Sequence, residues 1–172
     1  LSVNFKSQKI VDYFGDGSKW GIAITYLHEN KRLGTAGGLS LIEDDLDTPI
    51  IVTNADIITA LNYDELIEYH INNGSVATMC TREFEYNIPY GVVDIDEQKI
   101  KGLKEKPSYT YNVNAGIYVL EPHLIGFVPK NTFFDMPALF EKIVEMNLNS
   151  FAFPIKDYWI DVGHVSYYHK AN

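Results

Sequence analysis

The sequence predicts an α/β domain with a largely parallel sheet. Segments typical of strands alternate with segments typical of helices, which is the pattern of a sheet covered by helices. The 172 residues are 46% hydrophobic and 13% aromatic, enough to bury one sizeable core. No repeat, low-complexity linker or change in composition marks a boundary, so we expect residues 1–172 to form a single domain.

The first half of the chain contains three expected strands and two expected helices. The strands are residues 22–27, the near-continuous apolar run 49–53, and residues 76–81. A helix over residues 36–43 is preceded by Thr35, a typical cap. The second helix begins after Asn62, has Glu65 at its third position in a near-match to a capping box, and stops at Gly74.

After Tyr90 the pattern changes to a β-hairpin. Residues 91–95 and 99–104 are its expected strands, joined by the polar turn Asp96-Glu97-Gln98. A strand follows at 113–120, a short helix after Glu121, and a longer helix capped by Asp135. A last strand is expected at 150–155 and a helical segment at 167–171.

Charge and composition exclude several classes of function. The net charge of -9 argues against binding to nucleic acid or to an anionic membrane, and no apolar run is long enough to cross a bilayer. A bound nucleotide would therefore need a divalent cation and local donors. Cys80 is expected to be a buried free thiol in a reducing cytosol, and the five His residues lack zinc-ligand spacing.

Seven short motifs follow one another in a fixed order. They are Phe14-Gly15-Asp16-Gly17-Ser18, Leu33-Gly34-Thr35-Ala36-Gly37-Gly38, Asn54-Ala55-Asp56, Tyr90-Gly91-Val92-Val93, Glu105-Lys106-Pro107, Asn114-Ala115-Gly116 and Trp159-Ile160-Asp161-Val162-Gly163. The small residues at 34–38 let backbone approach a planar ring, and free N–H groups at a helix start can bind phosphate. Asp56 follows a strand, where the carboxyl ends of strands form ligand crevices and a carboxylate can hold Mg²⁺.

Each motif also has an ordinary structural explanation. Residues 34–38 could simply be a Thr-capped helix start, and Asp56 could cap the next turn. Glu105-Lys106-Pro107 could be a solvated turn, and Asp161 a surface residue before Gly163. The first motif, 14–18, is interpreted as a structural turn only.

The ordered set resembles the sugar-phosphate nucleotidylyltransferases, over nearly the whole chain. Phe134-Asp135-Met136-Pro137 and Tyr158-Trp159-Ile160-Asp161 are most similar to a bacterial subgroup joined to a regulatory CBS-domain pair, which resembles mannose-1-phosphate guanylyltransferases. The resemblance implies a three-layer α/β/α, GT-A-like nucleotide-diphospho-sugar transferase domain with a mixed, mainly parallel sheet. Nothing in the chain matches the family's leading strand and Gly-rich loop, so we expect an N-terminally truncated fragment.

The resemblance also implies a role for each motif. Nucleotide binding falls to Gly34, Thr35, Ala36 and Gly37, and sugar-phosphate binding to Tyr90, Gly91, Glu105, Lys106, Asn114 and Gly116. Asp56 and Asp161 are implied to hold Mg²⁺ and, with Lys106, to act in catalysis. The family more often has Gly where Ala55 stands and Thr where His164 stands.

The implied reaction joins a nucleoside triphosphate, with GTP expected, to a sugar 1-phosphate and releases pyrophosphate. We expect a cytoplasmic enzyme of nucleotide-sugar and cell-surface glycan synthesis that binds neither nucleic acid nor membrane. The fragment itself is expected to be inactive and to self-associate as a homo-oligomer. Two alternatives remain: a non-catalytic regulatory or assembly domain of the same fold, and a GT-A-like glycosyltransferase, whose Asp-x-Asp pair is missing at 54–56.

Overall fold

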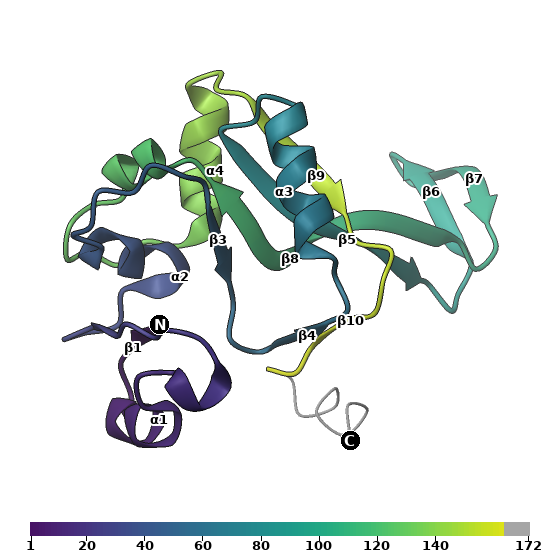
Figure 1. The fold of residues 1–172 in the computed structure, drawn as a ribbon. Helices are drawn as coiled ribbons and strands as arrows, with labels where there is room; N and C mark the ends of the chain where they lie inside the picture. The colour runs from purple at the N-terminus through teal and green to yellow at the C-terminus, as the bar shows by residue number, and fades with distance from the viewer. Residues whose placement is uncertain (164–172) are drawn as a thin grey trace.

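A four-stranded mixed sheet forms the centre of the computed structural model, which describes residues 1–163 (Figure 1). The strands lie in the order β3 (Ile50–Thr53), β8 (Ser108–Leu120), β5 (Ala77–Asn87), β9 (Ser150–Pro154). β8 is antiparallel to both of its neighbours, whereas β5 and β9 are parallel. Three of the four strands therefore point the same way, and the mixed sheet implied by the resemblance is confirmed.

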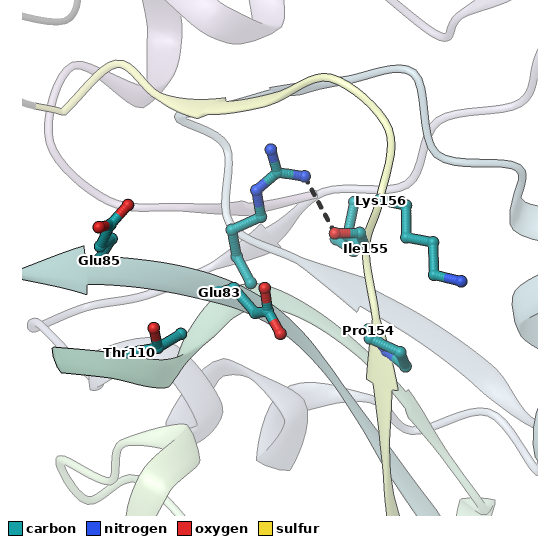
Figure 2. Close-up of a pocket in the computed structure, with 7 residues that line it drawn as sticks. Glu83, Glu85, Thr110, Pro154, Ile155 and Lys156 are labelled. Carbon is teal, nitrogen blue, oxygen red and sulfur yellow. Dashed lines mark hydrogen bonds between the residues drawn. The ribbon is translucent and has the colours of Figure 1, made fainter. Parts of the chain in front are cut away.

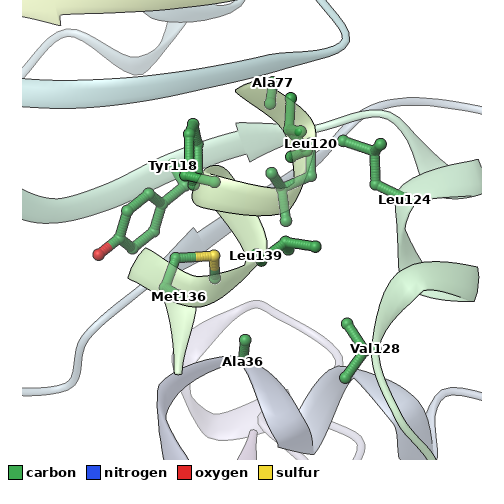
Figure 3. Close-up of a cluster of buried hydrophobic side chains, with 10 residues drawn as sticks. Ala36, Ala77, Tyr118, Leu120, Leu124, Val128, Met136 and Leu139 are labelled. Atoms are coloured by element: carbon green, nitrogen blue, oxygen red, sulfur yellow. The ribbon is translucent and has the colours of Figure 1, made fainter. Parts of the chain in front are cut away.

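Helices cover both faces of this sheet, because β8 is apolar on both sides. On one face, Tyr118 and Leu120 pack against Leu139 of α4 (Met136–Glu145) (Figure 3). Ile117 and Val119 belong to a second cluster that includes Leu66 of α3 (Tyr63–Asn72). The three layers expected of the fold are present.

The elements with local sequence signals lie close to where the sequence predicts them. Asn62 caps α3, since its side-chain oxygen accepts hydrogen bonds from the N–H groups of Asp64 and Glu65. The hairpin is present as β6 (Val92–Asp96) and β7 (Lys99–Lys104), and the short helix as η3 (Pro122–Phe127). The helical segment expected at 167–171 lies outside the described residues.

The N-terminal part forms a separate two-stranded parallel sheet of β1 (Ser2–Val3) and β2 (Leu27–His28), with α1 (Ser7–Phe14) and η1 (Ser18–Trp20) between them. The strand predicted at 22–27 is wrong except at its last residue. The chain instead wraps the turn at 15–18, where Ile24 N–H donates to the Asp16 carbonyl. Ser18 donates to the Asp16 carboxylate from both its N–H and its hydroxyl, so this motif is a structural turn.

A buried polar network ties α3 to β5. Ser75 Oγ donates to the Ala77 carbonyl and Thr78 Oγ1 donates to Ser75 Oγ, so His70 Nδ1, 2.8 Å from Thr78 Oγ1, must be a donor. In the neutral ring Nε2 then carries a lone pair, which faces Glu121 Oε1 at 3.5 Å without a hydrogen bond. Burial lowers the pKa of His70 below its usual 6.5, against the opposing pull of Glu121.

We expect this network to make folding stability sensitive to acid. Because the pKa of His70 is lower in the folded chain, the unfolded chain takes up this proton first, and the free energy of unfolding falls as pH drops below 6.5. His70→Gln should flatten that part of the profile. Urea unfolding at pH values above and below 6.5 measures it, and identical slopes for the two proteins would contradict the prediction.

No helix within residues 1–163 has the length and apolar character needed to cross a membrane.

Candidate active site

A β-bulge in β8 lies at the centre of the candidate site. Between the pairs Met79–Tyr118 and Thr81–Asn114, β5 contributes the single residue Cys80, and β8 contributes three. The sequence Asn114-Ala115-Gly116 forms this bulge, and Gly116 has a φ of +72°, which glycine adopts without strain. The bulge turns the carbonyls of Ala115 and Gly116 out of the hydrogen-bond ladder with β5, so they accept hydrogen bonds from other parts of the chain.

Two of the other motifs bind directly to these carbonyls. Asn54 N–H donates to the Gly116 carbonyl at 2.9 Å, and Trp159 Nε1 donates to the Ala115 carbonyl at 2.9 Å. The Asn54 side chain also covers Gly116, since a Cβ built there would lie 2.9 Å from Asn54 Nδ2. The bulge thus joins Asn54-Ala55-Asp56 to the strand that carries Asp161.

Asp56 and Asp161 converge, as the resemblance to the family implies. β4 (Ile57–Thr59) pairs antiparallel with β10 (Trp159–Asp161), and Val162 N–H donates to the Asp56 carbonyl at 2.8 Å. A Cβ built on Gly163 would lie 2.8 Å from Asp56 Oδ2 and 3.0 Å from Asp161 Oδ1. The two carboxylates therefore meet at Gly163, where only a residue without a side chain leaves them room.

This pair suits a metal that keeps open positions. Mg²⁺ is commonly held by one or two carboxylates together with substrate phosphates. Both carboxylates are exposed, and no third His, Cys, Asp or Glu joins them within residues 1–163. The donor set fits Mg²⁺ shared with phosphate, and it does not form a closed protein cage.

The Asn114 side chain is fixed by the bulge itself. Its Oδ1 accepts from Gly116 N–H at 2.9 Å, and its Nδ2 donates to the Tyr118 hydroxyl at 2.8 Å. Burial raises the pKa of Tyr118, so this phenol stays protonated. One amide hydrogen and one lone pair of Asn114 remain for a ligand.

The hairpin base holds a second group of predicted residues. A Cβ on Gly91 would lie 3.1 Å from Glu105 Oε2, so the motifs that bracket the hairpin do meet. Tyr90 and Lys106 are exposed, and Lys106 forms no hydrogen bond or ion pair within residues 1–163. About 20 Å of extended β8 separates Ser108 from Asn114. This structure therefore leaves Glu105 and Lys106 apart from the bulge.

The residues predicted for nucleotide binding pack against the start of α4. They lie in α2 (Gly34–Gly37), which passes at Gly38 into a 3₁₀ turn, η2 (Gly38–Leu41), so the single helix predicted at 36–43 is wrong. The N–H groups of Ala36 and Gly37 donate to the Phe134 carbonyl. A Cβ on Gly37 would lie 2.8 Å from the Thr132 carbonyl, so only glycine fits where these two backbone segments approach each other.

Thr35 and Asp135 each cap the helix that the sequence assigns to the other residue. Thr35 N–H donates to Asp135 Oδ1 at 2.9 Å, and Met136 N–H donates to Thr35 Oγ1 at 2.8 Å. The hydroxyl of Thr35 therefore caps α4, and the Asp135 side chain does not. The N–H groups of Thr35, Ala36 and Gly37 all donate hydrogen bonds to Phe134 or Asp135. A nucleotide could therefore contact only the solvent-accessible surface of Gly34 and Thr35 in this segment.

Sequence reasoning missed Arg82. Its guanidinium donates to the carbonyls of Ile155 and Asp157 at 3.0 and 2.8 Å, which holds the loop that leads into β10. A cavity of about 460 Å³ opens beside this loop, lined also by Glu83, Glu85, Thr110, Pro154 and Lys156 (Figure 2). None of the predicted site residues lines it. Arg82 comes one residue after the strand predicted at 76–81, and nothing in that position indicates a contact with carbonyls more than 70 residues later.

Cys80 plays no part in the chemistry of the site. It is fully buried, and burial raises the pKa of its thiol to about 12, so the thiolate is absent at neutral pH. The expectation of a buried free thiol is confirmed.

Known proteins are similar to this chain over most of its length. The family model described as nucleotidyl transferase matches residues 1–172. A UTP–glucose-1-phosphate uridylyltransferase from Synechocystis is 30% identical across 99% of this chain and 49% of its own length. A mannose-1-phosphate guanyltransferase from Yarrowia lipolytica is 34% identical across 95% of this chain and 47% of its own. The chain thus spans about half the length of the curated relatives it matches.

A solved structure is also similar to this chain over nearly its whole length. HddC from Yersinia pseudotuberculosis is 27% identical, with a TM-score of 0.71 over 99% of this chain and 75% of its own. The same protein complexed with GMP-PN has a TM-score of 0.69. The family match over the full chain shows that this chain belongs to the nucleotidyl transferase family.

Proposed function

We propose that the protein containing this chain transfers a nucleotidyl group from a nucleoside triphosphate to a sugar 1-phosphate and releases pyrophosphate. The observation that carries the proposal is the meeting of Asp56 and Asp161 at Gly163, on strands drawn together by the bulge at 114–116. Relatives named as guanylyl and uridylyl transferases support the reaction class. The guanyltransferase relative and the GMP-PN complex of HddC favour GTP with mannose 1-phosphate.

In this proposal the two carboxylates would hold Mg²⁺ together with the phosphates. When bound, the metal would neutralise negative charge on the reacting phosphate. The sugar 1-phosphate oxygen is already an anion, so no side chain needs to remove a proton from it. The chain contributes alignment instead. Asn114 and the Gly116 backbone would line the sugar pocket. Lys106 would hold the sugar phosphate and Glu105 would accept from sugar hydroxyls once the hairpin base, which this structure leaves about 20 Å of extended strand from the bulge, lies over that pocket.

Pyrophosphate release tests the reaction. The whole protein is incubated with Mg²⁺, with GTP, UTP or dTTP in turn, and with mannose or glucose 1-phosphate. We expect nucleotide sugar and pyrophosphate in equal amounts, and the highest kcat/KM with GTP and mannose 1-phosphate. Transfer of sugar from a nucleotide sugar to another acceptor, with no pyrophosphate formed, would instead make the protein a glycosyltransferase. No turnover with any pair would favour a non-catalytic domain.

Lys106→Met should raise the KM for sugar 1-phosphate more than it disturbs folding. Lys106 is exposed and pairs with nothing within residues 1–163, so the folded chain loses no contact with its removal. A lost charge-assisted contact to phosphate corresponds to about 10-fold or more in kcat/KM. Lys9→Met, another exposed lysine, is the control. Equal kinetics for the two variants would favour a solvated turn at Glu105-Lys106-Pro107.

A further inference from the structure

The motif at 134–137, where α4 begins, has no role in the proposed reaction, yet it contacts a segment that does. It lies against residues 33–37, to which the resemblance assigns the nucleotide. The carbonyl of Phe134 accepts from the N–H groups of Ala36 and Gly37 at 3.0 and 2.9 Å. The backbone of one segment is therefore held to the other, although they are about 100 residues apart in sequence.

Asp135 and Thr35 complete this junction with a closed ring of hydrogen bonds. The Thr35 hydroxyl accepts from Met136 N–H at 2.8 Å, so its own hydrogen points elsewhere, and it donates to Asp135 Oδ1 at 3.3 Å. The same carboxylate oxygen accepts from Thr35 N–H at 2.9 Å. One oxygen of Asp135 thus fixes both the backbone and the side chain of Thr35.

Asp135 also lies directly behind Gly34. The φ of Gly34 is +81°, and a Cβ built on it would lie 2.6 Å from Asp135 Oδ1 and 2.7 Å from the Phe134 carbonyl. These groups fill one side of Gly34, which is half-buried, whereas Thr35 is exposed. A ligand can therefore approach the pair only from the side opposite Asp135.

We propose that Asp135 is the positioning residue of the nucleotide-binding segment. Its carboxylate holds Thr35 and supports Gly34 from behind, so the two residues that a nucleotide can reach keep one conformation. A segment already held in its bound conformation loses less conformational entropy when the ligand binds. The inference rests on the proposed function, because residues 34–37 would bind the nucleoside triphosphate of that reaction.

Calorimetric titration of the whole protein with GTP and Mg²⁺ tests this role. Asp135→Ala should weaken GTP binding by about 10-fold, since it removes two hydrogen bonds that hold the segment, and should leave the KM for sugar 1-phosphate unchanged. Asp135→Asn should restore GTP binding, because the amide oxygen can accept both bonds. Asp16→Ala is the matched control: Asp16 Oδ1 accepts from the N–H and the hydroxyl of Ser18, the same pair of bonds, in a structural turn. This control should bind GTP as wild type does.

The outcomes separate the role of Asp135 from the proposed reaction. Equal GTP affinity for Asp135→Ala and Asp16→Ala overturns the proposal, and so does an Asp135→Asn variant that binds as weakly as Asp135→Ala. If wild type binds GTP but forms no pyrophosphate, the proposed function fails, and the same variants still decide the role of Asp135. A wild type that binds none of GTP, UTP and dTTP overturns both.

Substitutions of Thr35 test whether Asp135 acts through it, and they decide the matter if thermal melting shows that Asp135→Ala does not fold. Thr35→Val removes the hydroxyl from the ring and should weaken GTP binding, whereas Thr35→Ser keeps the hydroxyl and should not. The losses caused by Thr35→Val and Asp135→Ala should combine to less than their product, since both break one ring. Losses that multiply, or equal binding by Thr35→Val and Thr35→Ser, overturn the proposal.

Discussion

Asp161→Asn should lower kcat/KM by about 10²–10³-fold with little change in stability, because it removes one of the two charges that would hold the metal against the phosphates. Asp161 is exposed, and its Oδ1 accepts from Gly163 N–H at 2.8 Å, a bond that the amide oxygen of Asn can replace. Asp56→Asn should have an effect of the same order.

Steady-state rates across a series of Mg²⁺ concentrations measure this effect. Asp44→Asn, an exposed carboxylate in the loop after η2, is the matched control and should behave as wild type. If the two variants each lose activity, the double variant should lose little more, since both residues serve one metal. Losses that multiply would contradict a shared site.

Gly116→Ala should both unfold more easily and lose activity. The φ of +72° costs an Ala about 1–2 kcal/mol. The added Cβ would also displace Asn54 and weaken the hydrogen bond from Asn54 N–H to the Gly116 carbonyl, which contributes about 1 kcal/mol. The total is about 2–3 kcal/mol. Because Asn54 precedes Asp56 by two residues, the displacement also moves a metal carboxylate.

Substitutions at two other glycines separate the cost of backbone strain from the cost of displacing Asn54. A Cβ on Gly126 meets nothing within 4 Å, and Gly126→Ala should be close to neutral. Gly74 has a φ of +57° and equally open surroundings, so Gly74→Ala reports backbone strain alone. Urea unfolding of all three variants should rank Gly116 as the most costly, and only Gly116→Ala should reduce activity. Equal costs at Gly74 and Gly116 would show that contact with Asn54 contributes nothing.

Local signals in the sequence are enough for much of the fold. The cap at Asn62 depends on residues two and three positions away, and the hairpin turn at Glu97 and Gln98 on immediate neighbours. Strand β3 was recognisable from a continuous apolar run. In each case the interactions that define the element lie within a few residues.

The features that assemble the site depend on contacts distant in sequence. Thr35 and Asp135 are 100 residues apart, so neither pattern indicates that the hydroxyl of one caps the helix of the other. The bulge at 114–116 is defined by its register against Cys80. Arg82 acts on carbonyls more than 70 residues later. The meeting of Asp56 and Asp161 was foreseen only because the ordered motifs resemble a known family.

In the proposed reaction, Asp56 and Asp161 hold one metal ion together with phosphate. Crystals of the whole protein with Mn²⁺ in place of Mg²⁺, and with nucleotide and sugar phosphate bound, test it through anomalous diffraction. We predict one strong peak between the two carboxylates at coordination distance from an oxygen of each, about 2.0–2.2 Å, and in contact with a phosphate oxygen. A peak held by other residues, or ordered substrates with no metal between Asp56 and Asp161, would contradict a metal site shared by these two carboxylates.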